Sequence, residues 1–304
     1  MTIDGAYTVS RSIYKDMIMK KKLSRTALVV EGGGMRGIFA AGVLDLFMEK
    51  KFDPFDLYIG VSAGACNLAS HLAGQHRRNF RIYTRLMTRP DFISMKKFLR
   101  GGHMMDLDYL WDVIEVEDPL AVKDIFRLRK KDYIVVATDI ESGTPVYINP
   151  DAENCNTCLK ASSAVPFLYR GNLEVNSVRC VDGGVTDPIP AREAYLRGAR
   201  NIVVVRTRPG AFRKKKGMEN YLSSFATRRW PKLSRAVKSQ ADTYSRCVDF
   251  ILDPPRDAAI CQIAPEGPLK TGRTTQKVEL LLADYDTGRR AGEAFMTLWK
   301  RIIG

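Results

Sequence analysis

The chain has few of the residues on which several enzyme classes depend. The 304-residue chain has three histidines, His71, His76 and His103, so no imidazole side chain follows residue 103. Its six cysteines are scattered, and a disulfide framework is not expected at this density. Cys155 and Cys158 form an isolated C-x-x-C pair without the further ligands that a zinc site needs. We therefore expect free thiols and no metal or redox centre.

Long apolar runs are also missing. No stretch is apolar and long enough to be a membrane-spanning helix, and residues 1–25 lack the continuous apolar core of a signal peptide. We expect a cytoplasmic protein, peripheral at a membrane if one of its surfaces binds lipid.

The positive charge is concentrated in one segment. The formal net charge is +14, and residues 206–246 alone contain twelve basic and two acidic side chains, a net +10. An excess confined to one segment predicts a surface that faces an anionic partner.

Strand and helix patterns alternate along the chain. Apolar, β-branched runs predict strands, and segments with helical spacing lie between most of them. The predicted strands are 26–31, 56–61, 133–140, 178–182, 201–207 and 248–254. The pattern predicts an α/β fold, a three-layer sandwich with a largely parallel central sheet flanked by helices. We expect one domain over 1–304, with a core at 26–205, a basic insertion at 206–246, and C-terminal strands and helices at 247–304.

A glycine-rich turn follows the first of these strands. Residues 32–37, GGGMRG, fit the G-x-G-x-x-G pattern of a dinucleotide site, and Asp53 and Asp56 have roughly the offset of the ribose-binding acid. Both aspartates, however, precede the next strand instead of ending it. The alternative is that the backbone N–H groups of this turn stabilise an oxyanion, with Arg36 adding positive charge.

The next strand ends in Gly60-Val61-Ser62-Ala63-Gly64, the G-x-S-x-G pattern of a serine nucleophile between close-packed glycines. In hydrolases with this pattern the catalytic histidine follows the acidic residue in the sequence, and here no histidine follows residue 103. Asp182, which ends a short strand before Gly183 and Gly184, is a candidate to accept the proton directly from Ser62. Asp139 and Asp187 are rival candidates for the base. Alternatively, Asp182 is an ordinary turn residue whose carboxylate bonds to its own backbone turn.

Three separated motifs together resemble one family. They are EGGGMRG (31–37), GVSAG (60–64) and VDGG (181–184), with ASSAVPFLY (161–169) before the last. Over about residues 26–205 they resemble the patatin-like phospholipases. The resemblance implies a patatin-like fold and a lipid acyl hydrolase with a Ser62–Asp182 dyad, an acyl-enzyme intermediate, and no metal or other cofactor. It also implies an oxyanion hole formed by Gly32, Gly33, Gly34, Met35, Arg36 and Gly37. Glu31 and Asp187 depart from the residues common in the family, which leaves substrate preference open.

The basic segment carries an apolar stripe. Met218, Tyr221, Leu222 and Phe225 have helical spacing, which suits a helix at a lipid surface or one that covers the protein's own core. We expect anionic phospholipid to be contacted by Lys214, Lys215, Lys216, Arg228, Arg229 and Trp230. The alternative function is a non-enzymatic or weakly active binder of anionic lipid or nucleic acid through 206–246, although no nucleic-acid module is visible.

Overall fold

The apolar runs of the sequence form a central sheet. The computed structural model describes residues 2–3, 7–8, 25–127, 131–171, 173–215, 217 and 227–303. Within these residues the central sheet has eight strands, and β1 (Thr2–Ile3) and β2 (Tyr7–Thr8) form a separate antiparallel pair. The central strands are β3 (Arg25–Val30), β4 (Leu57–Val61), β5 (Asp132–Asp139), β6 (Pro145–Ile148), β7 (Leu173–Val175), β8 (Val178–Asp182), β9 (Ala199–Val205) and β10 (Ala259–Ile263).

The sheet is parallel over most of its width. Its order is β10-β9-β3-β4-β5-β8-β7, in which β10 to β5 run parallel, while β8 and β6 pair antiparallel with β5. The parallel strands β3 and β4 therefore end at the same edge of the sheet, where Val30 pairs with Gly60. The glycine turn and Ser62 both begin at this edge.

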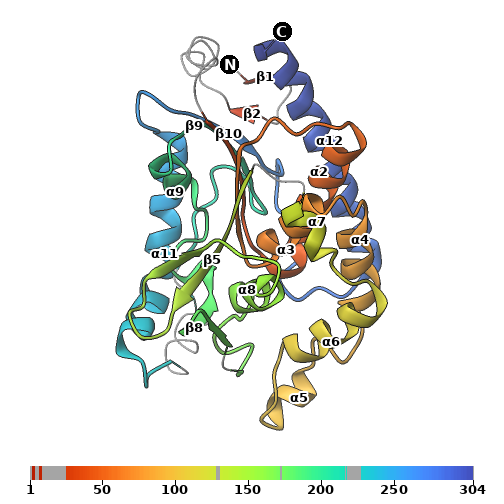
Figure 1. Cartoon of the computed structure of the whole chain (residues 1–304), viewed down its shortest axis with the longest axis vertical. Helices are drawn as coiled ribbons and strands as arrows, with labels where there is room; N and C mark the ends of the chain where they lie inside the picture. The colour runs from red at the N-terminus through yellow and green to blue at the C-terminus, as the bar shows by residue number, and fades with distance from the viewer. Residues whose placement is uncertain are drawn as a thin grey trace.

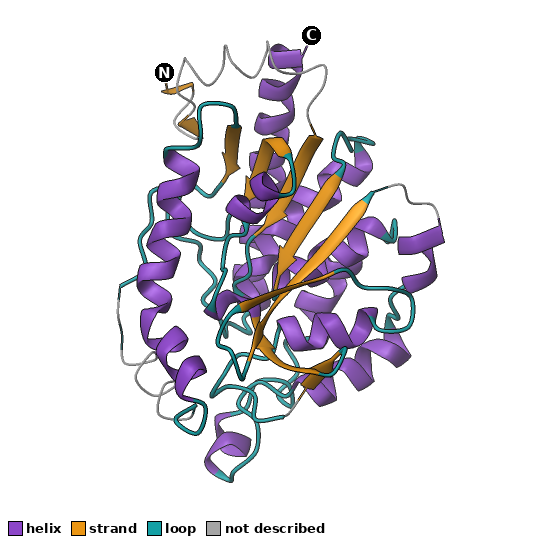
Figure 2. Cartoon of the chain, turned by 60° about the vertical axis from the view of Figure 1, so that its left-hand side comes forward, coloured by secondary structure: helices purple, strands orange, loops and turns teal. Residues whose placement is uncertain are grey.

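Both faces of the sheet are covered, which explains why its strands are continuously apolar. Along β3, Leu28 and Val30 pack into one core, whereas Ala27 and Val29 pack into the core on the opposite face. The first face is covered by α2 (Gly37–Glu49), α3 (Ala63–Leu72), α8 (Cys155–Ser162) and α12 (Val278–Ile303). The second face is covered by α9 (Ala191–Leu196) and α11 (Pro231–Leu252) (Figures 1 and 2). The predicted three-layer α/β sandwich is confirmed.

Most of the remaining helical elements contribute residues to the wall of the site. The main helical elements are η1 (Gly34–Arg36), α2 (Gly37–Glu49), α3 (Ala63–Leu72), α4 (Arg78–Arg81), η2 (Ile82–Leu86), α5 (Met95–Leu99), α6 (Leu107–Glu117), α7 (Val122–Arg127), α8 (Cys155–Ser162), η3 (Gly183–Val185), α9 (Ala191–Leu196), α11 (Pro231–Leu252) and α12 (Val278–Ile303).

The strand predicted at 248–254 is wrong, because most of this run is the last part of helix α11. The buried residues Val237, Ala241, Tyr244, Val248 and Ile251 lie at helical spacing along α11, and the last three pack into the core on the second face of the sheet. Seen alone, the run 248–254 resembled a buried strand, whereas the longer pattern is helical. At the β10 end of the sheet the edge strand is Ala259–Ile263, which was not predicted.

The prediction that 206–246 is an insertion outside the core also needs correction. Arg206 is fully buried, and α11 begins inside this segment and continues past its expected end. The C-terminal helix α12 is equally integral, since a Cβ atom at Gly288 would lie only 2.0 Å from the Phe39 carbonyl oxygen of α2. In the part of the chain that the structure describes, no helix is both long and apolar enough to cross a membrane.

Candidate active site

The end of β4 carries Ser62 in a strained conformation. Its backbone has φ 54° and ψ −130°, a region that residues with a side chain rarely adopt. Ser62 then begins α3, and only 8% of its surface is exposed. The flanking glycines permit this turn: a Cβ atom at Gly64 would lie 2.3 Å from the Val30 carbonyl oxygen, and one at Gly60 would lie 2.5 Å from Ala65 Cα.

A buried serine fixes the backbone of this turn. The Ser62 N–H donates to Ser162 Oγ at 2.7 Å, and Ser162 Oγ donates to the Val136 carbonyl oxygen at 2.6 Å. Ser162 is fully buried at the end of α8, so its hydroxyl links the serine turn to β5. The sequence analysis included Ser162 in the ASSAVPFLY motif but gave it no role.

Asp182 lies beside Ser62 at the end of β8. The Ser62 hydroxyl lies close enough to the Asp182 carboxylate to lower the pKa of that carboxylate, although the residues are far apart in the sequence, and both line one cavity. The Gly184 N–H donates to Asp182 Oδ1 at 2.7 Å, and Thr138 Oγ1 donates to the Asp182 carbonyl oxygen at 2.9 Å. These bonds fix both the carboxylate and its backbone.

Burial raises the pKa of Asp182 above its ordinary value, and it outweighs the opposing effects of the Ser62 hydroxyl and the Gly184 N–H on that pKa. Positive charge on Arg273 and Lys214 acts in the same lowering direction. A carboxylate with a raised pKa is a stronger base than an exposed aspartate, which suits proton abstraction from a hydroxyl.

The rival aspartates have other partners and do not line the cavity at Ser62. Asp139 accepts hydrogen bonds from the Glu141 and Ser142 N–H groups and so stabilises a turn. Asp187 accepts a hydrogen bond from the Tyr147 hydroxyl at 2.8 Å. Asp182 is thus the candidate base that the fold brings to the serine.

The glycine turn lies directly against Ser62. A Cβ atom at Gly32 would lie 2.9 Å from Ser62 Cβ, and Gly34 has a φ of 58°, which favours glycine. Among the residues expected to form an oxyanion hole, Gly32, Gly33, Gly34 and Arg36 line the cavity.

Met35 and Gly37 do not line it. The Met35 N–H donates to the Arg273 carbonyl oxygen at 3.0 Å, and the Gly37 N–H bonds back into the helical turn η1. Their N–H groups already have partners within the fold. The expected oxyanion hole is therefore limited to Gly32, Gly33, Gly34 and Arg36.

A buried charged network anchors the glycine turn from behind. Glu31, at the end of β3, accepts hydrogen bonds from the Thr207 N–H at 2.7 Å, the Tyr244 hydroxyl at 2.7 Å and Arg206 Nε at 3.3 Å. Thr207 Oγ1 in turn donates to the Gly32 carbonyl oxygen at 2.8 Å. The turn is therefore connected to β9 and α11.

The two glycines after Asp182 serve close packing and hydrogen bonding. A Cβ atom at Gly183 would lie 2.2 Å from the Val136 carbonyl oxygen, so β8 approaches β5 closely here. The Gly184 carbonyl oxygen accepts a hydrogen bond from Gln240 Nε2 of α11 at 2.7 Å.

A cavity of about 200 Å³ opens onto Ser62 and Asp182. One wall is apolar and comes from η2, α6, α8 and the loops next to them. Its main side chains are Ile82, Tyr83, Met87, Phe92, Met105, Leu107, Leu110, Trp111, Ile114, Leu120 and Leu159. An apolar wall beside a nucleophile is suited to an acyl chain.

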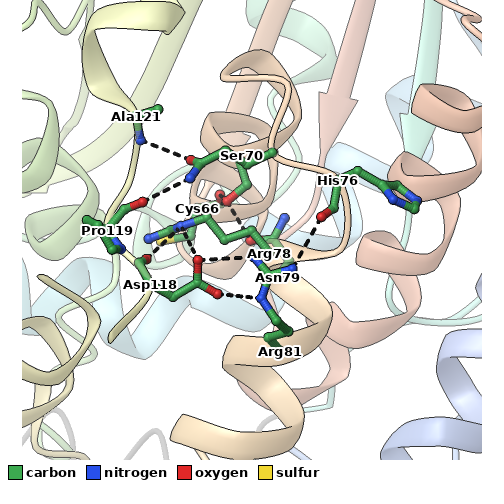
Figure 3. Close-up of polar contacts among 10 residues, drawn as sticks. Cys66, Ser70, His76, Arg78, Asn79, Arg81, Asp118, Pro119 and Ala121 are labelled. Carbon is green, nitrogen blue, oxygen red and sulfur yellow. Dashed lines mark hydrogen bonds and ion pairs between the residues drawn. The ribbon is translucent and has the colours of Figure 1, made fainter. Parts of the chain in front are cut away.

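The apolar wall is fastened to α3 by a buried polar network (Figure 3). Arg78 is 5% exposed, and it donates to Ser70 Oγ at 2.9 Å and to the Asp118 carbonyl oxygen at 2.9 Å. The Asp118 carboxylate lies between Arg78 and Arg81, and it accepts a bond from Arg81 Nε at 2.7 Å. Arg78 thus has an acidic partner, which fixes α4 and the loop before α7.

The residues expected at a lipid surface have different positions. Lys214 lines the cavity instead of facing outward, which corrects that expectation, and burial together with Arg273 lowers its pKa to about 8. Lys215 is exposed.

Farther along the segment, Arg228 and Arg229 are exposed and Trp230 packs partly against Leu233 and its neighbours. Lys216 and the expected stripe at 218–225 lie outside the described residues.

The other candidate sites lie elsewhere in the fold. Asp53 and Asp56 precede β4, at the opposite end of the strand from the glycine turn, so they do not form a ribose-binding position next to it. Cys155 and Cys158 are buried free thiols in α8, and burial raises the pKa of each to about 12.

Among the described residues, His103, Asp106 and Asp108 bring three ligand atoms of the kind that bind metals within 4.8 Å of one another. Asp108 already pairs with Lys160 at 2.7 Å, and His103 Nδ1 accepts a bond from the Arg170 N–H. The group contains neither Ser62 nor Asp182.

The arrangement of serine turn, glycine turn and aspartate agrees with a comparison of the chain with known families. The family model of the patatin-like phospholipases matches residues 28–195. The chain belongs to the patatin-like phospholipase family. A second family model, a domain of unknown function (DUF6363), matches residues 230–304 of this patatin-like protein.

Relatives of this chain include proteins from bacteria and a virus. It is 36% identical over 285 residues to the uncharacterized protein YjjU of Escherichia coli, covering 92% of the chain and 79% of YjjU. It is 25% identical over 190 residues to Probable lipid hydrolase 463L of Invertebrate iridescent virus 6, covering 57% of the chain and 63% of that protein. VipD from Legionella pneumophila is a similar solved structure, with a TM-score of 0.44 and 14% identity over 91% of this chain and 67% of VipD. Membership of the family indicates a lipid hydrolase.

Proposed function

We propose that the protein is a serine acyl hydrolase that cleaves carboxylic esters of lipids through Ser62 and Asp182. The observation that carries this proposal is the proximity of the Ser62 hydroxyl to the buried Asp182 carboxylate, at a cavity with an apolar wall. The strained turn at Ser62 supports it, because such strain is concentrated at functional sites.

In the first half of the reaction, Ser62 Oγ attacks the ester carbonyl carbon and its proton passes to Asp182. The carbonyl oxygen becomes an oxyanion beside the glycine turn, where N–H groups and the Arg36 cation stabilise negative charge. The bond from the carbonyl carbon to the alcohol oxygen then breaks, and the alcohol takes the proton from Asp182. An acyl group remains on Ser62.

In the second half, water attacks the acyl group and gives a proton to Asp182. The bond to Ser62 Oγ breaks, Oγ takes the proton back, and a fatty acid leaves. The raised pKa of Asp182 supports its role in both halves of the reaction, because a group that accepts and returns protons functions best when its pKa is closer to the operating pH.

The experiment that tests this proposal measures fatty acid release from dispersed, short-chain acylglycerols. Wild type is expected to release acid with a transient acyl group on the Ser62 peptide, found by mass spectrometry after rapid quenching. Ser62→Ala should do neither, while an exposed control, Lys238→Met on α11, should behave as wild type. Hydrolysis that survives Ser62→Ala in a folded protein would refute the proposed nucleophile.

We further infer that the substrate is reached at an anionic membrane surface. The exposed side chains of Lys215, Arg228 and Arg229 support this, because exposed cations attract anionic lipid. Sedimentation with vesicles of phosphatidylglycerol, compared with phosphatidylcholine, tests it. Equal sedimentation with both lipids would contradict it.

A further inference from the structure

Four cations gather on the side of the cavity opposite the acyl wall. Arg36 belongs to the turn η1, Arg208 and Lys214 follow β9, and Arg273 precedes α12, yet all four line the same cavity. Burial, together with repulsion from other cations of this group, lowers the pKa of Arg36, Lys214 and Arg273. Separate parts of the chain thus place like charges together, an arrangement that costs free energy in the absence of a balancing anion.

The cations lie next to the proposed reacting groups. A Cβ atom at Gly33 would lie 3.4 Å from Arg36 Nη2, and one at Gly34 would lie 2.9 Å from Arg273 Cγ. Lys214 Nζ donates to Gln240 Oε1 at 2.5 Å, and the same Gln240 donates to the Gly184 carbonyl oxygen. A ligand group held here would be adjacent to an ester carbonyl at Ser62.

Few carboxylates face Arg36, Arg208 and Lys214 within the described part of the chain. The carboxylates that line the cavity there are Glu31 and Asp182, and Glu31 is already paired with Arg206. Arg36 is 8% exposed, and its buried Nε has no hydrogen-bond partner. A buried guanidinium N–H without an acceptor is costly, which indicates that a ligand provides the acceptor.

We propose that the cluster of Arg36, Arg208, Lys214 and Arg273 binds a phosphate group of the substrate, so that the enzyme prefers acyl esters whose alcohol carries a phosphomonoester. This inference rests on the proposed hydrolase function and specifies its substrate class. Arginine side chains form paired hydrogen bonds with phosphate oxygens, and three of the four cations are arginines.

The number of cations favours a phosphomonoester over other lipid headgroups. Arg36, Arg208 and Lys214 set against an ionised Asp182 leave a formal excess of two positive charges, and a phosphomonoester carries about −1.5 to −2 near pH 7. A phosphocholine diester carries one negative charge and adds a quaternary ammonium group that the cluster repels. A plain acylglycerol has no charge for the cluster to bind.

The test compares three dispersed lysolipids with the same short acyl chain: a 1-acylglycerol 3-phosphate, the matching phosphocholine ester and the 1-acylglycerol. We expect kcat/KM to be at least roughly tenfold higher for the phosphomonoester than for the other two. Lys214→Met should lower the ratio of phosphomonoester to acylglycerol kcat/KM by roughly tenfold. Lys238→Met, which removes the same charge at an exposed position of α11, should keep the wild-type ratio.

A binding measurement separates this inference from the hydrolase proposal. Calorimetry with the Ser62→Ala protein should detect glycerol 3-phosphate, more weakly in Ser62→Ala/Lys214→Met, whether or not the wild type hydrolyses any ester. If wild type cleaves all three lysolipids equally, the hydrolase proposal stands and the phosphate inference is overturned. If inorganic phosphate binds as tightly as glycerol 3-phosphate and the lysolipids are not distinguished, the cluster holds a free anion, and the inference is likewise overturned.

Discussion

Replacing Glu31 by glutamine should destabilise the fold strongly, because it leaves a buried arginine without its charged partner. Glu31 is 4% exposed and Arg206 is fully buried. The carboxylate accepts bonds from Thr207 N–H, Tyr244 hydroxyl and Arg206 Nε on its two oxygens. Glutamine offers only one carbonyl oxygen, so its amide NH₂ must face a donor.

Breaking a buried ion pair by removing one partner costs about 3–5 kcal/mol, and we expect a loss of this size in the free energy of unfolding. Arg206 retains its bonds to Gln262 Oε1 and the Gly210 carbonyl oxygen, which limits the loss. Because Thr207 also holds the glycine turn, the hydrolysis rate should fall as well.

Urea unfolding followed by circular dichroism measures the effect as a lower midpoint at an unchanged slope. Glu266→Gln is the matched control, since Glu266 is exposed, and it should stay within about 0.5 kcal/mol of wild type. The double variant Glu31→Met/Arg206→Met should cost less than the two single changes added together. A Glu31→Gln protein within about 1 kcal/mol of wild type would refute the assigned role of the network.

Three further predictions concern the serine turn. Ser162→Ala leaves the Ser62 N–H and the Val136 carbonyl without their partner, so urea unfolding should report a loss of about 1–3 kcal/mol and kcat should fall; unchanged values would contradict the bracing role. Ser62→Gly should be more stable than Ser62→Ala by about 1 kcal/mol, because glycine relieves the positive φ that alanine keeps; equal stability would mean that the turn is not strained. Because Asp182 must be deprotonated and burial raises its pKa, kcat/KM should fall on acidification at a pH above ~3.9; a profile flat to that pH would argue against Asp182 as the base.

The sheet was predictable where its strands carry their own signal. Strands β3, β4, β5, β8 and β9 lie at the apolar runs that predicted them. The run 248–254 failed because its apolar residues serve a helix whose pattern extends over many more residues. The short strand β10 was missed because its place at the sheet edge depends on pairing with β9, a contact that local sequence does not encode.

The candidate site was predictable where chemistry and glycine spacing coincide. Ser62, Asp182 and the glycine turn carry motifs, and the fold brings them to one cavity. Lys214 was misplaced because sequence gives its charge but not the direction of its side chain.

Arg273 carried no signal, since a single arginine in a loop reaches the cavity only through the packing of α12 on α2. The cationic side of the cavity therefore depends on tertiary structure.

The most direct test of the account is labelling with a fluorophosphonate probe, which reacts with an activated serine. Wild type should be labelled at Ser62, Ser62→Ala should not be labelled, and Asp182→Asn should react much more slowly, with all three proteins checked for folding. Failure of folded wild type to label under several lipid conditions, or labelling that is as fast in Asp182→Asn, would contradict a hydrolase that operates through Ser62 and Asp182.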